Sequence, residues 1–91
     1  MTSKERAYFR WLANTIDPIC QVGKNGLNDN LLKQLDDALE ARELIKVNVL
    51  ETSGEDVREL AHEIAASVSA EVIQVIGKKF VLYRESKKDK K

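Results

Sequence analysis

The chain has 91 residues, of which 43% are hydrophobic and 33% are charged, so it is long enough for one small domain and too apolar for a disordered chain. Its 15 basic and 15 acidic residues cancel, but both ends are basic and the middle is acidic, a distribution that can orient a protein on a polyanion. No apolar run approaches the roughly 20 residues of a membrane helix, no secretory signal is visible, and a single cysteine excludes an internal disulfide. We therefore expect a cytoplasmic protein without membrane contact.

The first predicted element is a helix from about residue 3 to residue 14. Thr2 and Glu5 have the spacing of a capping box at its start. The face of this helix that we expect to pack is formed by Tyr8, Trp11, Leu12 and Thr15. Asp17-Pro18 ends the helix, and residues 19–22 form a short strand.

The Gly-Lys-Asn-Gly segment at residues 23–26 predicts a loop, after which Asn28 suits the N-cap of a second helix. Leucines at helical spacing extend that helix to about residue 42. Residues 44–50 then alternate, with Ile45, Val47 and Val49 on one face and polar side chains on the other. This alternation predicts a strand with at least one face open to polar contacts.

Thr52 to Glu55 have the spacing of a second capping box, which we expect to start a third helix. The apolar stripe of that helix is formed by Val57, Leu60, Ala61, Ile64, Ala65 and Val68. Residues 72–76 and 80–84 flank Gly77 and predict a hairpin. The order α-β-α-β-α-β-β therefore predicts an α/β fold of two layers, with three helices and a four-stranded mixed sheet.

Residues suited to catalysis are not grouped in this sequence. His62 lies off the apolar stripe of its helix, where we expect a solvated side chain, and no basic group is aimed at Cys20. Asp36 and Asp37 are adjacent and therefore diverge on a helix. We expect neither an enzyme nor a cofactor, and one histidine with one cysteine cannot form a typical zinc site.

The loop formed by Gly23, Lys24, Asn25 and Gly26 is the strongest candidate for a binding site. It precedes a helix N-terminus, where unpaired backbone amides and the helix dipole favour anions. Glycines let the backbone approach a phosphate closely, and a G-x-x-G loop clamps nucleic acid in KH domains. A simple turn, or a surface that binds protein, fits the same four residues. Cations that we expect around the loop are Lys46, Lys78, Lys79 and Arg84, together with Arg10 and its neighbours on the first helix.

Three separated blocks of the sequence, residues 18–27, 38–47 and 74–84, resemble the YhbY family, whose members are single CRM domains (chloroplast RNA splicing and ribosome maturation). The resemblance covers about residues 3–86. It implies a fold similar to the C-terminal domain of bacterial translation initiation factor three, with an extra N-terminal helix. The G-x-x-G loop of the family corresponds to residues 23–26, and its basic surface corresponds to residues such as Arg42, Lys46 and Arg84.

The resemblance also implies a function. It predicts a non-catalytic protein that binds ribosomal RNA on precursors of the large ribosomal subunit and acts in their assembly. We expect a monomer with one domain over residues 1–86 and a basic, disordered tail over residues 87–91. The alternative is an adaptor between proteins, which would dock on ribosomal proteins through its acidic helices.

Overall fold

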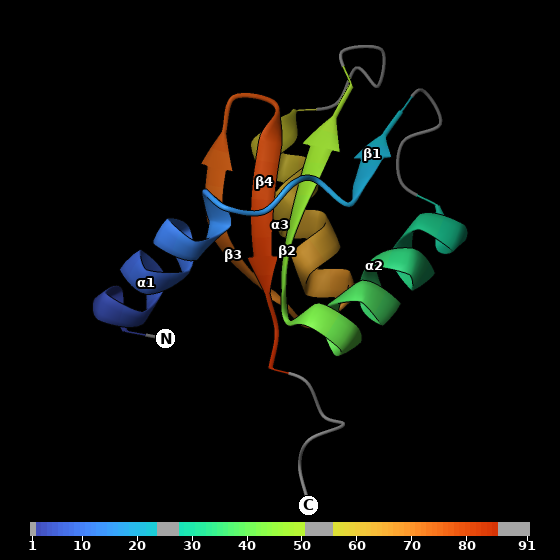
Figure 1. Cartoon of the computed structure of the whole chain (residues 1–91). Coiled ribbons are helices and arrows are strands. Elements are labelled where there is room, and N and C mark those ends of the chain that lie inside the picture. The colour runs from blue at the N-terminus through green and yellow to red at the C-terminus, as the bar shows by residue number, and fades with distance from the viewer. Residues whose placement is uncertain (1, 24–27, 51–55, 86–91) are drawn as a thin grey trace, which may run out of the picture.

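The computed structural model describes residues 2–23, 28–50 and 56–85 of the chain. Its elements follow the predicted order, and Figure 1 shows how they are arranged. They are α1 (Ser3–Ala13), β1 (Cys20–Val22), α2 (Asp29–Arg42), β2 (Leu44–Val49), α3 (Val57–Ser67), β3 (Glu71–Ile76) and β4 (Lys79–Tyr83).

The four strands form one mixed sheet in the spatial order β1-β2-β4-β3. β1 and β2 are parallel, whereas β4 is antiparallel to both of its neighbours. The C-terminal ends of β1 and β2 therefore lie at the same end of the sheet as the turn between β3 and β4, at the top of Figure 1. The predicted α/β class and mixed sheet are confirmed.

One face of the sheet packs on α2 and α3. The alternating residues of β2 that we expected inside, Ile45, Val47 and Val49, are buried there with Leu35 of α2 and Ile64 of α3. The leucines of α2 and the aliphatic residues of α3 recur at helical spacing, so each helix presents one apolar stripe to the sheet. This layer is the main hydrophobic core.

The other face of the sheet is covered only in part, by α1. Phe9 stacks on Tyr83 with ring centroids 4.1 Å apart, and Ala13 is buried against the sheet. The Arg6 guanidinium donates a hydrogen bond of 2.6 Å to the carbonyl oxygen of Val72, where the register between β3 and β4 shifts. The sequence-based choice of packing face was therefore wrong for Tyr8, Trp11 and Thr15, which are all exposed.

The helix starts are stabilised by their N-caps. The capping box of Thr2 and Glu5 and the cap at Asn28 are confirmed. The N-cap of α3 is Asp56, whose carboxylate accepts from the amides of the next turn. The prediction that Thr52 caps this helix is wrong, because an acceptor directly before Val57 satisfies the same orphan amides; residues 51–55 lie outside the described part of the chain.

The turn between β3 and β4 consists of Gly77 and Lys78. Gly77 has a φ of 55°, which is the left-handed region required at the first central position of a type II′ hairpin turn. The turn therefore fixes the register in which Ile76 pairs with Lys79. The prediction of a hairpin around this glycine is confirmed.

Candidate nucleic-acid interface

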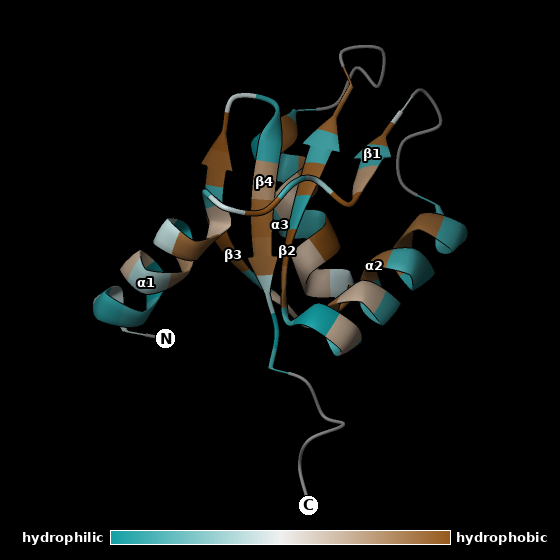
Figure 2. Cartoon of the chain, in the orientation of Figure 1, coloured by the Kyte–Doolittle hydropathy of each residue, from teal (hydrophilic) through white to brown (hydrophobic). Residues whose placement is uncertain are grey.

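A row of polar side chains crosses the uncovered sheet face at its loop end. Gln21 of β1 is paired with Asn48 of β2, and Asn48 is paired with Lys79 of β4. Because paired positions point to the same side of a sheet, the three side chains lie together on the face that α2 and α3 leave open. Figure 2 shows hydrophilic residues at the upper parts of these three strands.

A surface groove of about 470 Å³ follows this row. Its polar lining is Gln21, Asn48 and Lys79, and its remaining lining is Pro18, Ile19 and Cys20. The two side-chain amides each offer a donor and an acceptor, and the lysine offers a cation. The groove therefore combines hydrogen-bonding groups, a positive charge and an apolar wall, which are the groups that contact bases and phosphates in RNA complexes.

Gly23 lies at the end of β1, directly beside this row. The amide of Leu50 donates a hydrogen bond of 2.9 Å to the carbonyl oxygen of Val22, and the amide of Val49 donates one of 2.6 Å to the carbonyl oxygen of Lys78. These bonds hold the start of the glycine loop and the hairpin turn on either side of the end of β2, so Gly23 and Lys78 are roughly 10 Å apart. The structure thus brings together part of the predicted site; Lys24, Asn25 and Gly26 lie outside the described residues.

The fold itself does not require a glycine at position 23. A Cβ atom built there would meet only Leu50 Cδ1, at 3.5 Å, which is an ordinary contact, and the residue does not have a left-handed φ. The missing side chain therefore leaves the backbone open to close approach from outside. This observation fits a glycine that serves a ligand.

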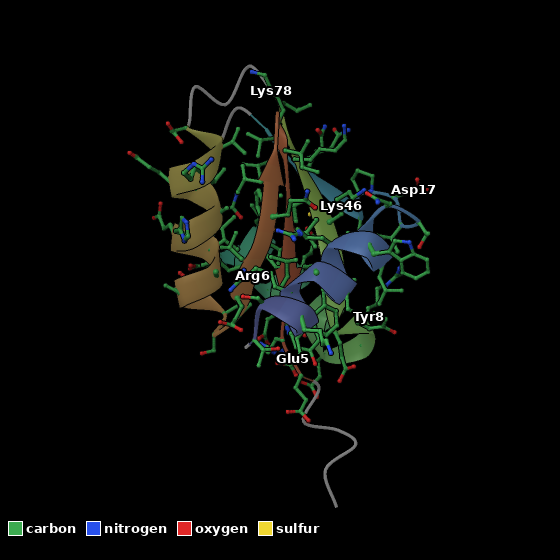
Figure 3. The ribbon with its side chains drawn as sticks, turned by 90° about the vertical axis from the view of Figure 1, so that its left-hand side faces the viewer. Glu5, Arg6, Tyr8, Asp17, Lys46 and Lys78 are labelled. Atoms are coloured by element: carbon green, nitrogen blue, oxygen red, sulfur yellow. The ribbon has the colours of Figure 1, made fainter. Side chains whose placement is uncertain are left out.

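Lys46 extends the row along β2. It lies two residues before Asn48 and on the same face, which places the two positions about 7 Å apart. The amide of Ile19 donates a hydrogen bond of 2.9 Å to the carbonyl oxygen of Lys46, so the segment between α1 and β1 runs beside Lys46. Figure 3 shows Lys46 on the α1 side of the sheet and Lys78 above it. We call Gln21, Gly23, Lys46, Asn48, Lys78 and Lys79 the loop-end surface.

Arg42 and Arg84 lie at the opposite end of the sheet. Arg42 is the last residue of α2 and immediately precedes the region where β2 begins, whereas Gly23 is beside the end of β2. A strand of six residues spans roughly 18 Å. Arg10 lies on the exposed surface of α1 and is likewise outside the loop-end surface.

Arg84 is engaged by the protein itself. Its side chain is 13% exposed and forms ion pairs with Asp36 at 2.5 Å and Glu40 at 3.3 Å. It also donates to the carbonyl oxygens of Val68 and Asp36. The guanidinium therefore joins the end of β4 to α2 and to the end of α3, and its donors point away from the open sheet face.

The residues considered for catalysis are separate from one another. His62 is exposed on α3, as the sequence predicted. Burial raises the pKa of the Cys20 thiol, so this half-buried group is a poorer nucleophile than a free cysteine. In the described part of the chain, no group of three or more side chains could hold a metal ion. Within the same residues, no helix is long and apolar enough to cross a membrane.

Sequence reasoning missed two exposed aromatic residues, Tyr8 and Trp11, as candidates for binding. Their spacing was visible, but it also fits a packed face, and only the position of α1 on the sheet decides between the two. The amide row was missed as a unit for a similar reason. Gln21 and Asn48 come from different strands, so their alignment depends on the register.

Comparison with known proteins gives a consistent result. The family model described as the CRS1 / YhbY (CRM) domain matches residues 1–84. The chain is 46% identical over 90 residues to "Probable RNA-binding protein YqeI" of Bacillus subtilis, covering 99% of this chain and 94% of that protein. It is 32% identical over 90 residues to an RNA-binding protein of Haemophilus influenzae, covering 99% and 91% of the two chains. The solution structure of a hypothetical protein from Staphylococcus aureus is similar with a TM-score of 0.82 and 51% identity, over 99% of this chain and 94% of that one.

Proposed function

Because this chain belongs to the CRS1/YhbY (CRM) domain family, we propose that it is an RNA-binding protein without catalytic activity. Its proposed target is ribosomal RNA in precursors of the large ribosomal subunit, and its proposed role is in the assembly of that subunit in the cytoplasm. The names of the relatives support RNA binding. The choice of ribosomal RNA rests on the resemblance to single-domain family members.

The observation that carries this proposal is the loop-end surface. An exposed row of two amides and a lysine adjoins a glycine that the fold does not need. Lys46 adds positive charge on the same sheet face, farther along β2, and Lys78 adds it at the turn between β3 and β4. Phosphates would be held by the lysines and by backbone amides of the loop, while Gln21 and Asn48 would contact bases or ribose hydroxyls.

Sedimentation of cell lysate through a sucrose gradient tests the proposed target. We expect the protein to sediment with precursors of the large subunit and to leave that fraction after limited ribonuclease treatment. Sequencing of RNA crosslinked to the protein in cells should recover ribosomal RNA as the main species. A variant with Lys46→Ala and Lys79→Ala should lose this association. Lys33→Ala, which removes one lysine from the exposed side of α2, should keep it and is the control for each single substitution.

The adaptor alternative makes the opposite prediction. Docking on ribosomal proteins through the acidic helices would survive ribonuclease treatment and would be insensitive to the two lysines. Persistent sedimentation with proteins after complete digestion of the RNA would therefore overturn the proposed function.

A further inference from the structure

Two aromatic side chains of α1 are exposed to solvent. Tyr8 is 56% exposed and Trp11 is 64% exposed, and they lie three residues apart on one side of the helix. Figure 3 shows Tyr8 on the side of α1 that is turned away from α3. Phe9 and Ala13 anchor the helix to the sheet, and the Tyr8 ring lies against Phe9 with ring centroids 5.5 Å apart. Both rings nevertheless keep more than half of their surface exposed to solvent.

A groove of about 630 Å³ begins at the C-terminal end of α1, beside Leu12, and neither ring is part of its lining. Leu12 and Thr15 line the groove from the α1 side, and Arg42 and Leu44 line it from the end of α2 and the start of β2. Leu12 lies one helical turn after Tyr8, so on α1 the Tyr8 side chain lies beside Leu12, at the edge of the groove. Trp11 directly precedes Leu12 in the last turn of α1, and Thr15 follows the end of that helix.

This groove adjoins the groove of the loop-end surface. Both are lined by Pro18 and Ile19, so the connection between α1 and β1 separates them and touches each. A ligand that lies along Gln21, Asn48 and Lys79 can therefore cross Pro18 and Ile19 and reach Arg42 and the aromatic rings. The two grooves therefore adjoin on either side of Pro18 and Ile19, one toward the loop end and the other toward the start of β2.

The chemistry of the second groove fits a nucleotide with its base unpaired. An aromatic ring offers a stacking surface to a base, and a guanidinium binds phosphate with two parallel donors. The carboxylate of Asp17, which also lines the groove, repels phosphate but accepts hydrogen bonds from an amino group of a base. A nucleotide whose phosphate binds Arg42 and whose base contacts Asp17 and the aromatic rings would therefore interact favourably with the guanidinium, the carboxylate and the rings.

We propose that RNA bound at the loop-end surface continues over Pro18 and places an unpaired base against Trp11 and Tyr8, with the adjoining phosphate at Arg42. This inference rests on the proposed function and narrows its substrate to RNA with unpaired nucleotides. A base within an A-form duplex is stacked on its neighbours and cannot reach a protein ring. Arg42, which lies far from the glycine loop, would then contact the same RNA that binds at the loop-end surface.

Trp11 is the only tryptophan in the sequence, so its fluorescence reports on a ligand that contacts this side of α1. We expect a short unstructured RNA to quench it during a titration in which fluorescence anisotropy of a labelled RNA follows binding independently. Trp11→Ala should weaken binding at least about fivefold, while Trp11→Phe, which keeps a ring, should lose less. Arg42→Ala should also weaken binding, and His62→Ala, which removes an exposed ring from α3, should leave the affinity unchanged.

The results separate this inference from the proposed function. Anisotropy that shows tight binding, with unchanged tryptophan fluorescence and unchanged affinity for Trp11→Ala, overturns the inference and leaves RNA binding intact. Equal affinity and equal quenching with a fully paired duplex also overturn it. Absence of any RNA binding by the wild type contradicts the proposed function itself.

Discussion

Asn48 and Lys79 lie opposite each other on β2 and β4, on the sheet face that α2 and α3 leave open. The pair is completed by Gln21 on the other side of Asn48, so three strands contribute one polar row beside Gly23. None of these three residues would indicate a binding site if its own strand were considered alone. Their alignment is what makes this end of the sheet a candidate binding surface.

Lys46→Ala and Lys79→Ala are expected to weaken RNA binding and to reduce its salt dependence. Each lysine that contacts a phosphate releases about one counterion when the RNA binds. Removing that lysine should therefore make the decrease of log affinity with log salt less steep, by about one unit of slope at most. The measurement is a series of RNA titrations at increasing potassium chloride. Lys33→Ala, on the exposed side of α2, should leave the slope unchanged. If Lys46→Ala and Lys79→Ala have the same slope as this control, the two lysines do not contact phosphate.

Arg84→Ala is expected to destabilise the fold and to leave the RNA affinity of the folded protein unchanged. The substitution removes the donors that Arg84 supplies to Asp36, to Glu40 and to the carbonyl oxygen of Val68. Because Asp36 is largely exposed, we expect a loss of about 1–3 kcal/mol in the free energy of unfolding. Urea denaturation measures the loss, and filter binding well below the unfolding midpoint measures the affinity. A stable variant with weakened RNA binding would instead place Arg84 in the interface.

The capping box of α1 is expected to make its stability depend on pH. Hydrogen bonds from the backbone amide and hydroxyl of Thr2 lower the pKa of Glu5 below its ordinary 4.5. A carboxyl group with a lowered pKa in the folded state stabilises the fold above its ordinary pKa, and the contribution is lost as the pH falls through the lowered value. Thermal melts of the wild type and Glu5→Ala should therefore differ at pH 7 and converge in acid. A difference that is constant over this range would show that the carboxylate has no part in the cap.

Cys20 is expected to react slowly with iodoacetamide at neutral pH. Burial raises the pKa of its thiol above the ordinary 9.0, so the reactive thiolate forms only in more alkaline solution. Cys20 is paired with Val47 and packs against the core of α2 and α3, on the sheet face opposite Gln21, so bound RNA should leave the rate unchanged. Mass spectrometry of the alkylated protein measures the rate with and without RNA, and rapid labelling at pH 7 would contradict this placement.

Most of the fold could be predicted because it follows from local patterns. The alternation of Ile45, Val47 and Val49 predicted the buried face of β2, and the leucine spacing predicted α2. Thr2 and Asn28 marked helix starts through residues adjacent in sequence. These signals are short in range, so one sequence contains them in full.

The errors arose where distant segments decide the outcome. Tyr8 and Trp11 looked like a packing face, but Phe9 and Ala13 pack instead, because Phe9 meets Tyr83 across the sheet. Arg84 looked like a surface cation, but it pairs with Asp36, 48 residues earlier in the chain. Neither relationship has a signal in the local sequence, since both depend on how the helices are placed on the sheet.

The most direct test of the central claim is the RNA affinity of Gly23→Asp, measured with its thermal unfolding. A Cβ fits at this position, so we expect an unfolding midpoint close to that of the wild type. The added carboxylate would stand at the start of the loop, where a phosphate is proposed to approach the backbone, and should weaken RNA binding roughly tenfold or more. A folded variant that binds RNA as tightly as the wild type would contradict the account.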